Sequence, residues 1–137
     1  MSIASGQDDF GFPAIDLPGD LNSAEDVARF LIEELARRGD VSPQQVDSLL
    51  EAILKREELG STAIGRGVAL PHAKSAAIDR VLGIIGRSKR PIRWSSQPNS
   101  QPVTAVYLLL TPKSRPGDGL SALEAVSRWL RNLSDDV

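Results

Sequence analysis

Two stretches in the first half of the chain carry apolar residues at the spacing of an amphipathic helix. In the first stretch these residues recur every three or four positions: Val27, Phe30, Leu31 and Leu35. Ser23 stands before the stretch as an N-cap, with Asp26 at the capping-box position, and Gly39 follows as a stop. Because such residues satisfy the free backbone groups at helix ends, the pattern predicts a helix between Ser23 and Gly39.

The second stretch has a stronger start signal. Ser42 is placed to cap a helix, and Pro43 follows at the position where its missing N–H costs nothing. The apolar stripe then follows the i, i+3, i+4, i+7, i+8 pattern, at Val46, Leu49, Leu50, Ile53 and Leu54. We expect this helix to end near Glu57 or Leu59, before Gly60.

From Gly60 onward the chain changes to short runs that are typical of β-strands. These runs are Gly67–Leu70, Arg80–Ile85, Ile92–Trp94 and Val103–Leu110. The last one, VTAVYLLL, is almost continuously apolar, which favours a strand covered on both faces. Phe12–Leu17 adds a short edge strand, and a closing helix is predicted from Leu120, Leu123, Val126, Leu130 and Leu133. These elements predict a single domain of the α/β class (α+β-like), a mixed central sheet with helices packed on it.

Composition narrows the classes of function. A length of 137 residues suits one domain, and a chain with no cysteine and one histidine has neither disulfides nor a thiolate or histidine-rich metal site. The 16 basic and 18 acidic residues give a net charge of −2, which argues against nucleic-acid binding. No apolar run approaches the roughly 20 residues of a membrane span. The N-terminal MSIASGQDDFGF lacks the pattern of a signal peptide, so we expect a cytoplasmic protein without membrane insertion.

Most of the candidate chemistry lies in one segment, REELGSTAIGRGVALPHAK, which spans Arg56 to Lys74. Its glycines allow a ligand to approach the backbone closely, and Ser61 and Thr62 add donors, so the segment is able to hold a phosphate. It matches neither the Walker loop nor the dinucleotide fingerprint. On spacing alone, Ser61 and Thr62 are also explained as turn or cap residues.

His72 is the one histidine of the chain and follows Pro71, which pushes Leu70 toward extended geometry. We therefore expect His72 just past a short strand, on its carboxyl side, where open α/β sheets bind ligands. A neutral imidazole is able to accept a phosphoryl group, and Arg56 has the planar fork that binds phosphate oxygens. The alternatives are a histidine satisfied at the surface or in the core, and an arginine that complements a helix dipole.

Taken together, RE-x-x-GSTAIGRGVALPHAK closely resembles the phosphohistidine signature of a bacterial family. This family is the type-2 enzyme IIA domains of the phosphoenolpyruvate-dependent sugar phosphotransferase system, of the fructose/mannitol and nitrogen-regulatory types. The two helices before the signature also match, and QPVTAVYLLLTP resembles the family's long core strand. The resemblance covers about residues 10 to 130.

The resemblance implies a fold, a reaction and its residues. The fold is a mixed sheet flanked by helices on both sides, formed by residues 11–137 after a loose lead-in at 1–10. His72 accepts a phosphoryl group on Nε2 from the phosphocarrier HPr, and passes it to a IIB partner or holds it as a signal. Arg56 matches the arginine that contacts this group, and Thr62, with Ser61, lies in the matching loop beside the histidine. The resemblance implies no metal and no organic cofactor.

The chain departs from the family pattern where relatives carry a second active-site histidine, at the start of the helix after the long strand. The corresponding stretch reads GDGLSAL, so Gly119 stands about where that histidine would be. This departure removes one polar partner of the phosphoryl group, which bears on onward transfer more than on phosphorylation itself. The chain also ends at Val137, earlier than many relatives, and a terminal element is therefore expected to be missing or dispensable.

Three functions are open at this point. The first is a phosphotransferase-system IIA component, an enzyme that carries a phosphoryl group on His72. The second is a regulatory, nitrogen-type binding module whose partners respond to the charge of phosphorylated His72, with little or no sugar transfer. The third is an interaction domain that has lost phosphorylation, and the presence of both Arg56 and His72 argues against it.

Overall fold

The computed structural model describes residues 11–95 and 101–135. The lead-in expected at residues 1–10 and the side chain of Leu133 lie outside this description. The elements follow in chain order as β1 (Ala14–Asp16), α1 (Ala24–Arg37), the 3-10 turn η2 (Pro43–Gln45), α2 (Val46–Glu58), β2 (Ala63–Gly65), β3 (Val68–Ala69), β4 (His72–Ser75), β5 (Leu82–Arg93), β6 (Pro102–Pro112) and α3 (Pro116–Asp135).

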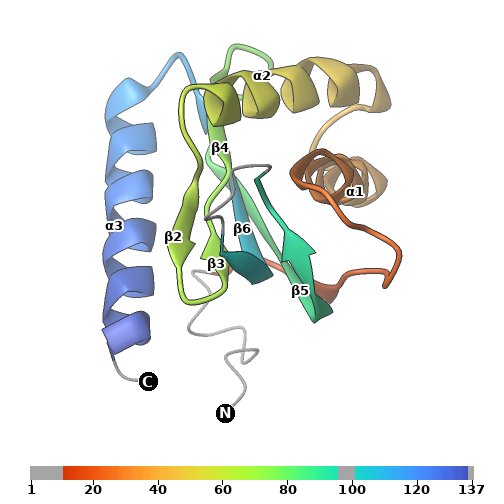
Figure 1. Ribbon diagram of the computed structural model, residues 1–137. Helices are drawn as coiled ribbons and strands as arrows, with labels where there is room; N and C mark the ends of the chain where they lie inside the picture. The colour runs from red at the N-terminus through yellow and green to blue at the C-terminus, as the bar shows by residue number, and fades with distance from the viewer. Residues whose placement is uncertain (1–10, 96–100, 136–137) are drawn as a thin grey trace.

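The sheet is mixed, as predicted, and helices cover both of its faces. Its order is β1-β5-β6-β3-β2, and β4 also pairs with β6. The β1–β5, β3–β6 and β4–β6 pairs are parallel, whereas β5–β6 and β2–β3 are antiparallel. Figure 1 shows α3 on one side of the sheet and α1 and α2 on the other. The predicted fold class is therefore confirmed.

The first helix begins where the sequence places it, whereas the second is preceded by a 3-10 turn at the predicted start and begins at Val46. The Ser23 Oγ accepts a hydrogen bond of 3.1 Å from the Asp26 N–H at the start of α1. Pro43 opens the short turn η2, which leads into α2, and the Gln45 side chain accepts a bond of 3.0 Å from the Ser42 N–H. α2 ends at Glu58, within the predicted limits.

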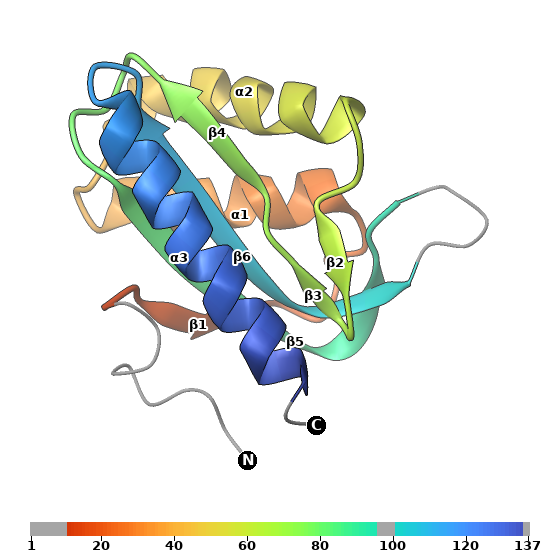
Figure 2. The ribbon, with the colours of Figure 1, turned by 90° about the vertical axis from the view of Figure 1, so that its left-hand side faces the viewer.

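Pro71 divides a segment that runs along one edge of β6 into two short strands. In β3, Ala69 is opposite Val106, and in β4, His72 is opposite Leu109. The ladder is interrupted between them because proline has no N–H to donate. The predicted run Gly67–Leu70 contains β3, and His72 follows it as expected, but His72 is also the first residue of a further strand, β4, which was not predicted. Figure 2 shows β3 and β4 following β6 in succession.

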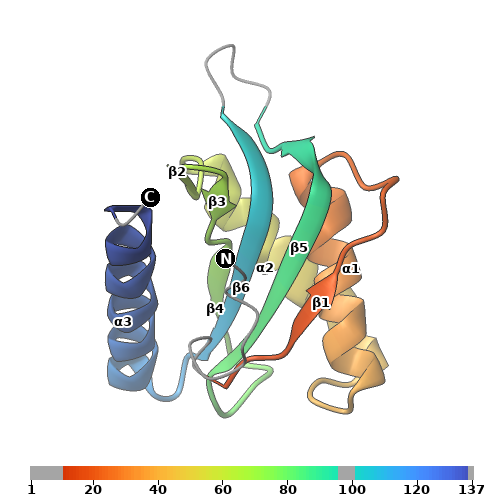
Figure 3. The ribbon, with the colours of Figure 1, turned by 90° about the horizontal axis from the view of Figure 1, so that it is seen from below.

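Two strands predicted separately, Arg80–Ile85 and Ile92–Trp94, are one strand, β5. The polar residues between them hide its continuity in the sequence, and the pairing with β6 changes register between Arg87 and Ile92. β5 and β6 lie side by side as the two long strands of the sheet (Figure 3). β2 was not predicted, and neither was a helix start as early as Pro116 in α3.

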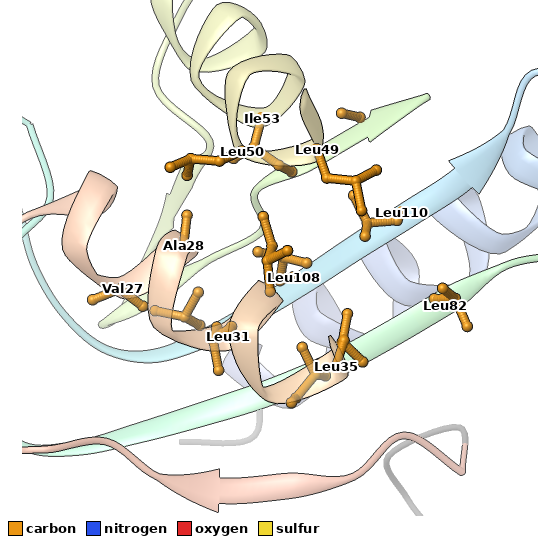
Figure 4. Close-up of a cluster of buried hydrophobic side chains, with 14 of the residues drawn as sticks. Val27, Ala28, Leu31, Leu35, Leu49, Leu50, Ile53, Leu82, Leu108 and Leu110 are labelled. Atoms are coloured by element: carbon orange, nitrogen blue, oxygen red, sulfur yellow. The ribbon is translucent and has the colours of Figure 1, made fainter. Parts of the chain in front are cut away.

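The largest apolar cluster lies between α1, α2 and the sheet (Figure 4). It holds fully buried side chains from all three: Val27, Leu31 and Leu35 of α1, Leu49 and Ile53 of α2, and Leu108 and Leu110 of β6. A second cluster lies between the sheet and α3, and contains Leu70, Ile85, Tyr107, Leu109, Val126 and Leu130. Alternate residues of β6 thus supply both cores, as expected for a strand covered on two faces.

Candidate functional site

His72 is half-buried, and its ring is held by the backbone of its own segment. The ring Nδ1 lies 2.8 Å from the carbonyl oxygen of Leu70. Because a carbonyl oxygen only accepts, this contact requires the proton of the neutral ring to be on Nδ1. Nε2 is then the atom with the free lone pair, and it is the nucleophilic atom of the ring.

The surroundings of the ring favour this neutral, nucleophilic form. Burial lowers the pKa of His72 below the ordinary histidine value of 6.5, and the positive charge of Arg56 lowers it further. The hydrogen bond to Leu70 and the negative charge of Glu57 act in the opposite direction. The net effect is a lowered pKa, so the imidazole is uncharged at neutral pH.

His72 lines a pocket of about 630 Å³ between α2, β4, β6 and α3. Most of its wall is apolar, with polar side chains at a few positions, which is typical of ligand sites. The pocket is lined by Ala52, Lys55, Arg56, His72, Ala73, Lys74, Leu109, Thr111, Pro116, Gly119, Leu120 and Leu123. Strand β4, which carries His72, therefore lies next to the C-terminal part of α2 and the N-terminal part of α3.

Arg56 reaches this pocket from the last turn of α2. Its Nη1 donates a hydrogen bond of 2.9 Å to the carbonyl oxygen of Gly60, just past the helix end. This bond satisfies a carbonyl near the helix C-terminus and holds the guanidinium close enough to lower the pKa of His72. The structure thus brings together the two residues that the sequence selects as catalytic.

Ser61 and Thr62 are placed differently, and neither is among the residues that line the pocket. Thr62 is buried, and its backbone N–H and its hydroxyl donate bonds of 2.9 and 2.6 Å to the Glu57 carboxylate. The Ser61 hydroxyl accepts a bond of 3.1 Å from the Ala63 N–H. A direct contact of either hydroxyl with a phosphoryl group stays a prediction.

The glycine-rich part of the signature is likewise not a lining of the pocket. Gly65, Arg66 and Gly67 all have positive φ and form the turn between β2 and β3. A turn of this kind explains the glycines by backbone conformation. The geometry therefore supports a turn at these glycines, and not a site that holds a phosphate.

Glu57 is a residue that sequence reasoning missed. Its carboxylate accepts the two bonds from Thr62 and one of 3.0 Å from the indole Nε1 of Trp94. It thereby ties the end of α2 to the segment before β2 and to the segment after β5. One signal in the sequence was available: Glu57 is next to Arg56 in the signature. Because neighbouring residues on a helix point in different directions, Glu57 was placed to contact a different segment from Arg56.

Three polar residues of the pocket were also not selected from the sequence. Lys74 lies two residues after His72 in β4, and so on the same face of the strand. Lys55 precedes Arg56 in α2, and Thr111 is near the end of β6. The pocket therefore combines a neutral imidazole nucleophile with three cations and one hydroxyl, a set suited to a phosphoryl group.

The described residues offer neither a metal site nor a helix that could span a membrane. Within residues 11–95 and 101–135, no group of three or more histidine, aspartate or glutamate side chains is placed to hold a metal ion. In the same part of the chain, no helix is both long and apolar enough to cross a membrane.

Residues 13–135 match the family model described as phosphoenolpyruvate-dependent sugar phosphotransferase system, EIIA 2. A nitrogen regulatory protein of Bradyrhizobium diazoefficiens is 39% identical over 102 residues, which are 74% of this chain and 66% of that protein. The 2-O-alpha-mannosyl-D-glycerate-specific EIIABC component of Escherichia coli is 29% identical over 123 residues, 90% of this chain and 18% of that protein. The chain thus spans less than two thirds of the length of these relatives.

Solved structures of enzyme IIA proteins are similar to this chain in fold. The nitrogen regulatory protein IIA-Ntr of Neisseria meningitidis has a TM-score of 0.66 at 28% identity, over 82% of this chain and 73% of that one. The mannitol enzyme IIA of Escherichia coli, determined in complex with phosphorylated enzyme IIB, has a TM-score of 0.57 at 17% identity. That match covers 81% of both chains and shows a shared fold.

Proposed function

The chain belongs to the type 2 EIIA family of the phosphoenolpyruvate-dependent sugar phosphotransferase system, and on this basis we propose that it carries a phosphoryl group on Nε2 of His72. Domains of this family are phosphoryl-transfer components. The proposal includes HPr as the donor, a IIB domain or a regulatory protein as the receiver, and the cytoplasm as the compartment. It needs no metal and no organic cofactor.

The observation that carries the proposal is the contact between the His72 Nδ1 and the Leu70 carbonyl. In the exchange, the lone pair of Nε2 forms a bond to the phosphorus of a phosphohistidine on the donor, and the donor's P–N bond breaks. The donor imidazole leaves with that electron pair and is neutral. The phosphorylated His72 ring then carries a positive charge with its proton still on Nδ1, and the carbonyl stabilises this proton.

The cations of the pocket support the other half of the reaction. In phosphoryl transfer, negative charge is spread over the equatorial oxygens of the transferred group. Arg56 is the best placed to meet this charge, because its guanidinium is held at the helix end and lines the pocket with His72. Lys55 and Lys74 add positive charge on exposed side chains.

A labelling experiment tests the proposal. We expect the protein, incubated with phosphoenolpyruvate, enzyme I and HPr, to gain one acid-labile, base-stable phosphate. Since His72 is the one histidine of the chain, His72→Ala is expected to abolish the label while the circular dichroism spectrum stays that of the wild type. A wild-type protein that takes no label, or a label that survives in His72→Ala, would disprove the proposal.

The same assay measures the role of Arg56. Arg56→Ala is expected to slow labelling at least tenfold and to change the melting temperature little, because its one hydrogen bond is exposed. Arg93→Ala is the matched control, since it removes an equal charge from an exposed position of β5 outside the pocket. Equal rates in both variants would show that Arg56 does not act on the phosphoryl group.

A regulatory role is the second candidate, and the nitrogen regulatory relatives favour it. In that case phosphorylation serves to change the charge of the surface around His72 rather than to feed a transporter. Labelled protein mixed with a purified sugar-specific IIB domain separates the two roles. Loss of the label to IIB supports carriage to a transporter, whereas a label that remains supports the regulatory module.

A further inference from the structure

Thr111 differs from the other polar residues of the pocket in being buried. The residue is 6% exposed, whereas Lys55 and Lys74 are exposed, and Arg56 is tied to the Gly60 carbonyl. Its side chain is also short, so that ordering it costs little conformational entropy. Apart from His72 itself, Thr111 is therefore the one neutral side-chain donor among the described residues that line the pocket.

The strand register places Thr111 on the same face as His72. His72 is opposite Leu109 and Lys74 is opposite Thr111, so that Thr111 is a diagonal neighbour of the histidine on the adjacent strand. Its hydroxyl donates to the carbonyl oxygen of Ala73, the residue after His72, over 3.4 Å. A bond of this length is weak, and a hydroxyl rotates freely enough to turn its proton to a stronger acceptor.

Gly119 is what allows α3 to lie directly over Thr111. A Cβ built on Gly119 would be 2.8 Å from the Thr111 Cβ and 3.1 Å from its Oγ1. Any side chain at this position would therefore push the helix away from the strand or cover the hydroxyl. Because both residues line the pocket, the bare helix backbone leaves the hydroxyl at its wall.

We propose that the Thr111 hydroxyl donates a hydrogen bond to the phosphoryl group on His72, and that Gly119 is the residue that makes this donor available. The proposal rests on phosphorylation of His72. A phosphoryl oxygen is charged, so it is a far better acceptor than the distant Ala73 carbonyl. The donor stabilises the charge on the group as it arrives and while it is held.

The test compares Thr111→Val, which replaces the hydroxyl by a methyl group, with Thr111→Ser, which keeps it. A lost hydrogen bond to a charged group is expected to slow phosphorylation by HPr about tenfold to a hundredfold in Thr111→Val. Thr111→Ser should stay within about threefold of the wild type. Urea unfolding of both variants shows that the proteins compared are folded.

A second readout is specific to contact with the phosphoryl group. In a pH titration followed by ³¹P NMR, the second pKa of the phosphoryl group is expected to be higher in Thr111→Val than in the wild type. The reason is that a hydrogen bond to the dianion favours the charged form. Thr111→Ser is expected to keep the wild-type pKa of the phosphoryl group. If Thr111 served only to pack the strand against α3, this pKa would not depend on the hydroxyl.

The outcomes separate this inference from the proposed function. If the wild type is labelled but Thr111→Val has an unchanged rate and an unchanged phosphoryl pKa, Thr111 is not a donor. If Thr111→Ser is as slow as Thr111→Val, packing matters and the hydroxyl does not, which also overturns the inference. A wild type that takes no label removes the proposed function itself.

Discussion

The two faces of the sheet are built for different tasks. The face covered by α1 and α2 holds the larger apolar cluster, with fully buried leucine, isoleucine and valine side chains from helices and strands. The face covered by α3 holds a smaller cluster, and beside it lies the pocket with His72, Lys74 and Thr111. Leu120, the first apolar residue of the α3 stripe, is 59% exposed next to that pocket.

This difference shows how a small domain stabilises its fold and still keeps a reactive residue accessible. Burial of apolar area on one face supplies most of the hydrophobic stabilisation. The other face then has room for the imidazole of His72, for the cation Lys74 and for the close contact between Gly119 and Thr111. The separation occurs within single strands, because alternate residues point to opposite faces.

The largest expected effect comes from truncating neighbouring leucines of β6 that belong to opposite faces. Leu108 packs toward α1 and α2, Leu109 packs toward α3 and lines the pocket, and each is 1% exposed. We expect Leu108→Ala to lower the free energy of unfolding by about 2–5 kcal/mol. Leu109→Ala should cost at least about 1 kcal/mol less, because the space it leaves joins an existing pocket. Urea unfolding measures both, and an equal or larger loss in Leu109→Ala would contradict the contrast between the faces.

A smaller effect is expected from adding a methyl group where α3 meets β6. Gly119→Ala places its Cβ 2.8 Å from the Thr111 Cβ, so we expect a loss of about 1–3 kcal/mol of unfolding free energy. Gly117 is the matched control, since it lies in the same helix turn with no atom within 4 Å of an added Cβ. Gly117→Ala should therefore be neutral, or stabilise by up to about 1 kcal/mol through helix propensity. Thermal melts of the two variants measure this difference. Equal stability of the two would show that α3 and Thr111 move apart at little cost to admit the added methyl group.

The smallest effect is the protonation of His72, which reports on the pocket. Its folded pKa is lowered by burial and by Arg56 relative to the ordinary 6.5. Between these two pKa values the unfolded chain binds more protons, so the free energy of unfolding rises with pH through this window and is constant above it. Because the chain has one histidine, its ring signal in an NMR titration gives the pKa without ambiguity.

Variants sharpen this titration. Arg56→Gln is expected to raise the pKa of His72, because a positive neighbour is removed, whereas Arg93→Gln should leave it unchanged. A folded pKa at or above that of the urea-unfolded protein would show that the ring is not desolvated in the pocket.

Sequence reasoning succeeded where the signal is local. The Ser23 cap, the start signal at Pro43 and the helical stripes of α1 and α2 are set by residues a few positions apart. α1 begins at the first signal, and at the second the turn η2 begins and leads into α2. The apolar run in β6 is equally local. His72 and Arg56 were selected from one continuous segment, and their catalytic roles stay a prediction.

The packing of segments against one another explains what sequence reasoning missed. Whether Thr62 faces His72 or Glu57 depends on how the end of α2 approaches the segment before β2. In the structure the Thr62 hydroxyl donates a hydrogen bond to the Glu57 carboxylate. Thr111 joins the pocket through its register with β4, and Gly119 through the approach of α3. The Thr111 hydroxyl meets a residue 38 positions away. Glu57 and Thr62 are close in sequence, as are Thr111 and Gly119, but the two members of each pair lie on different segments. Which residues meet therefore depends on how the segments pack, and periodicity within one segment carries no information on this.

The residue types and their local spacing therefore account for the helices, for the long core strand and for the choice of His72 as the candidate nucleophile. The assembled sheet and helices account for the tautomer of His72, for the cations and the hydroxyl that share its pocket, and for the closeness of α3 to β6 at Gly119. The physical reason is that helix caps and apolar periodicity act over one or two turns of chain. The chemistry of the site, in contrast, depends on distances of a few ångströms between strands and helices, which are set when the two apolar clusters pack.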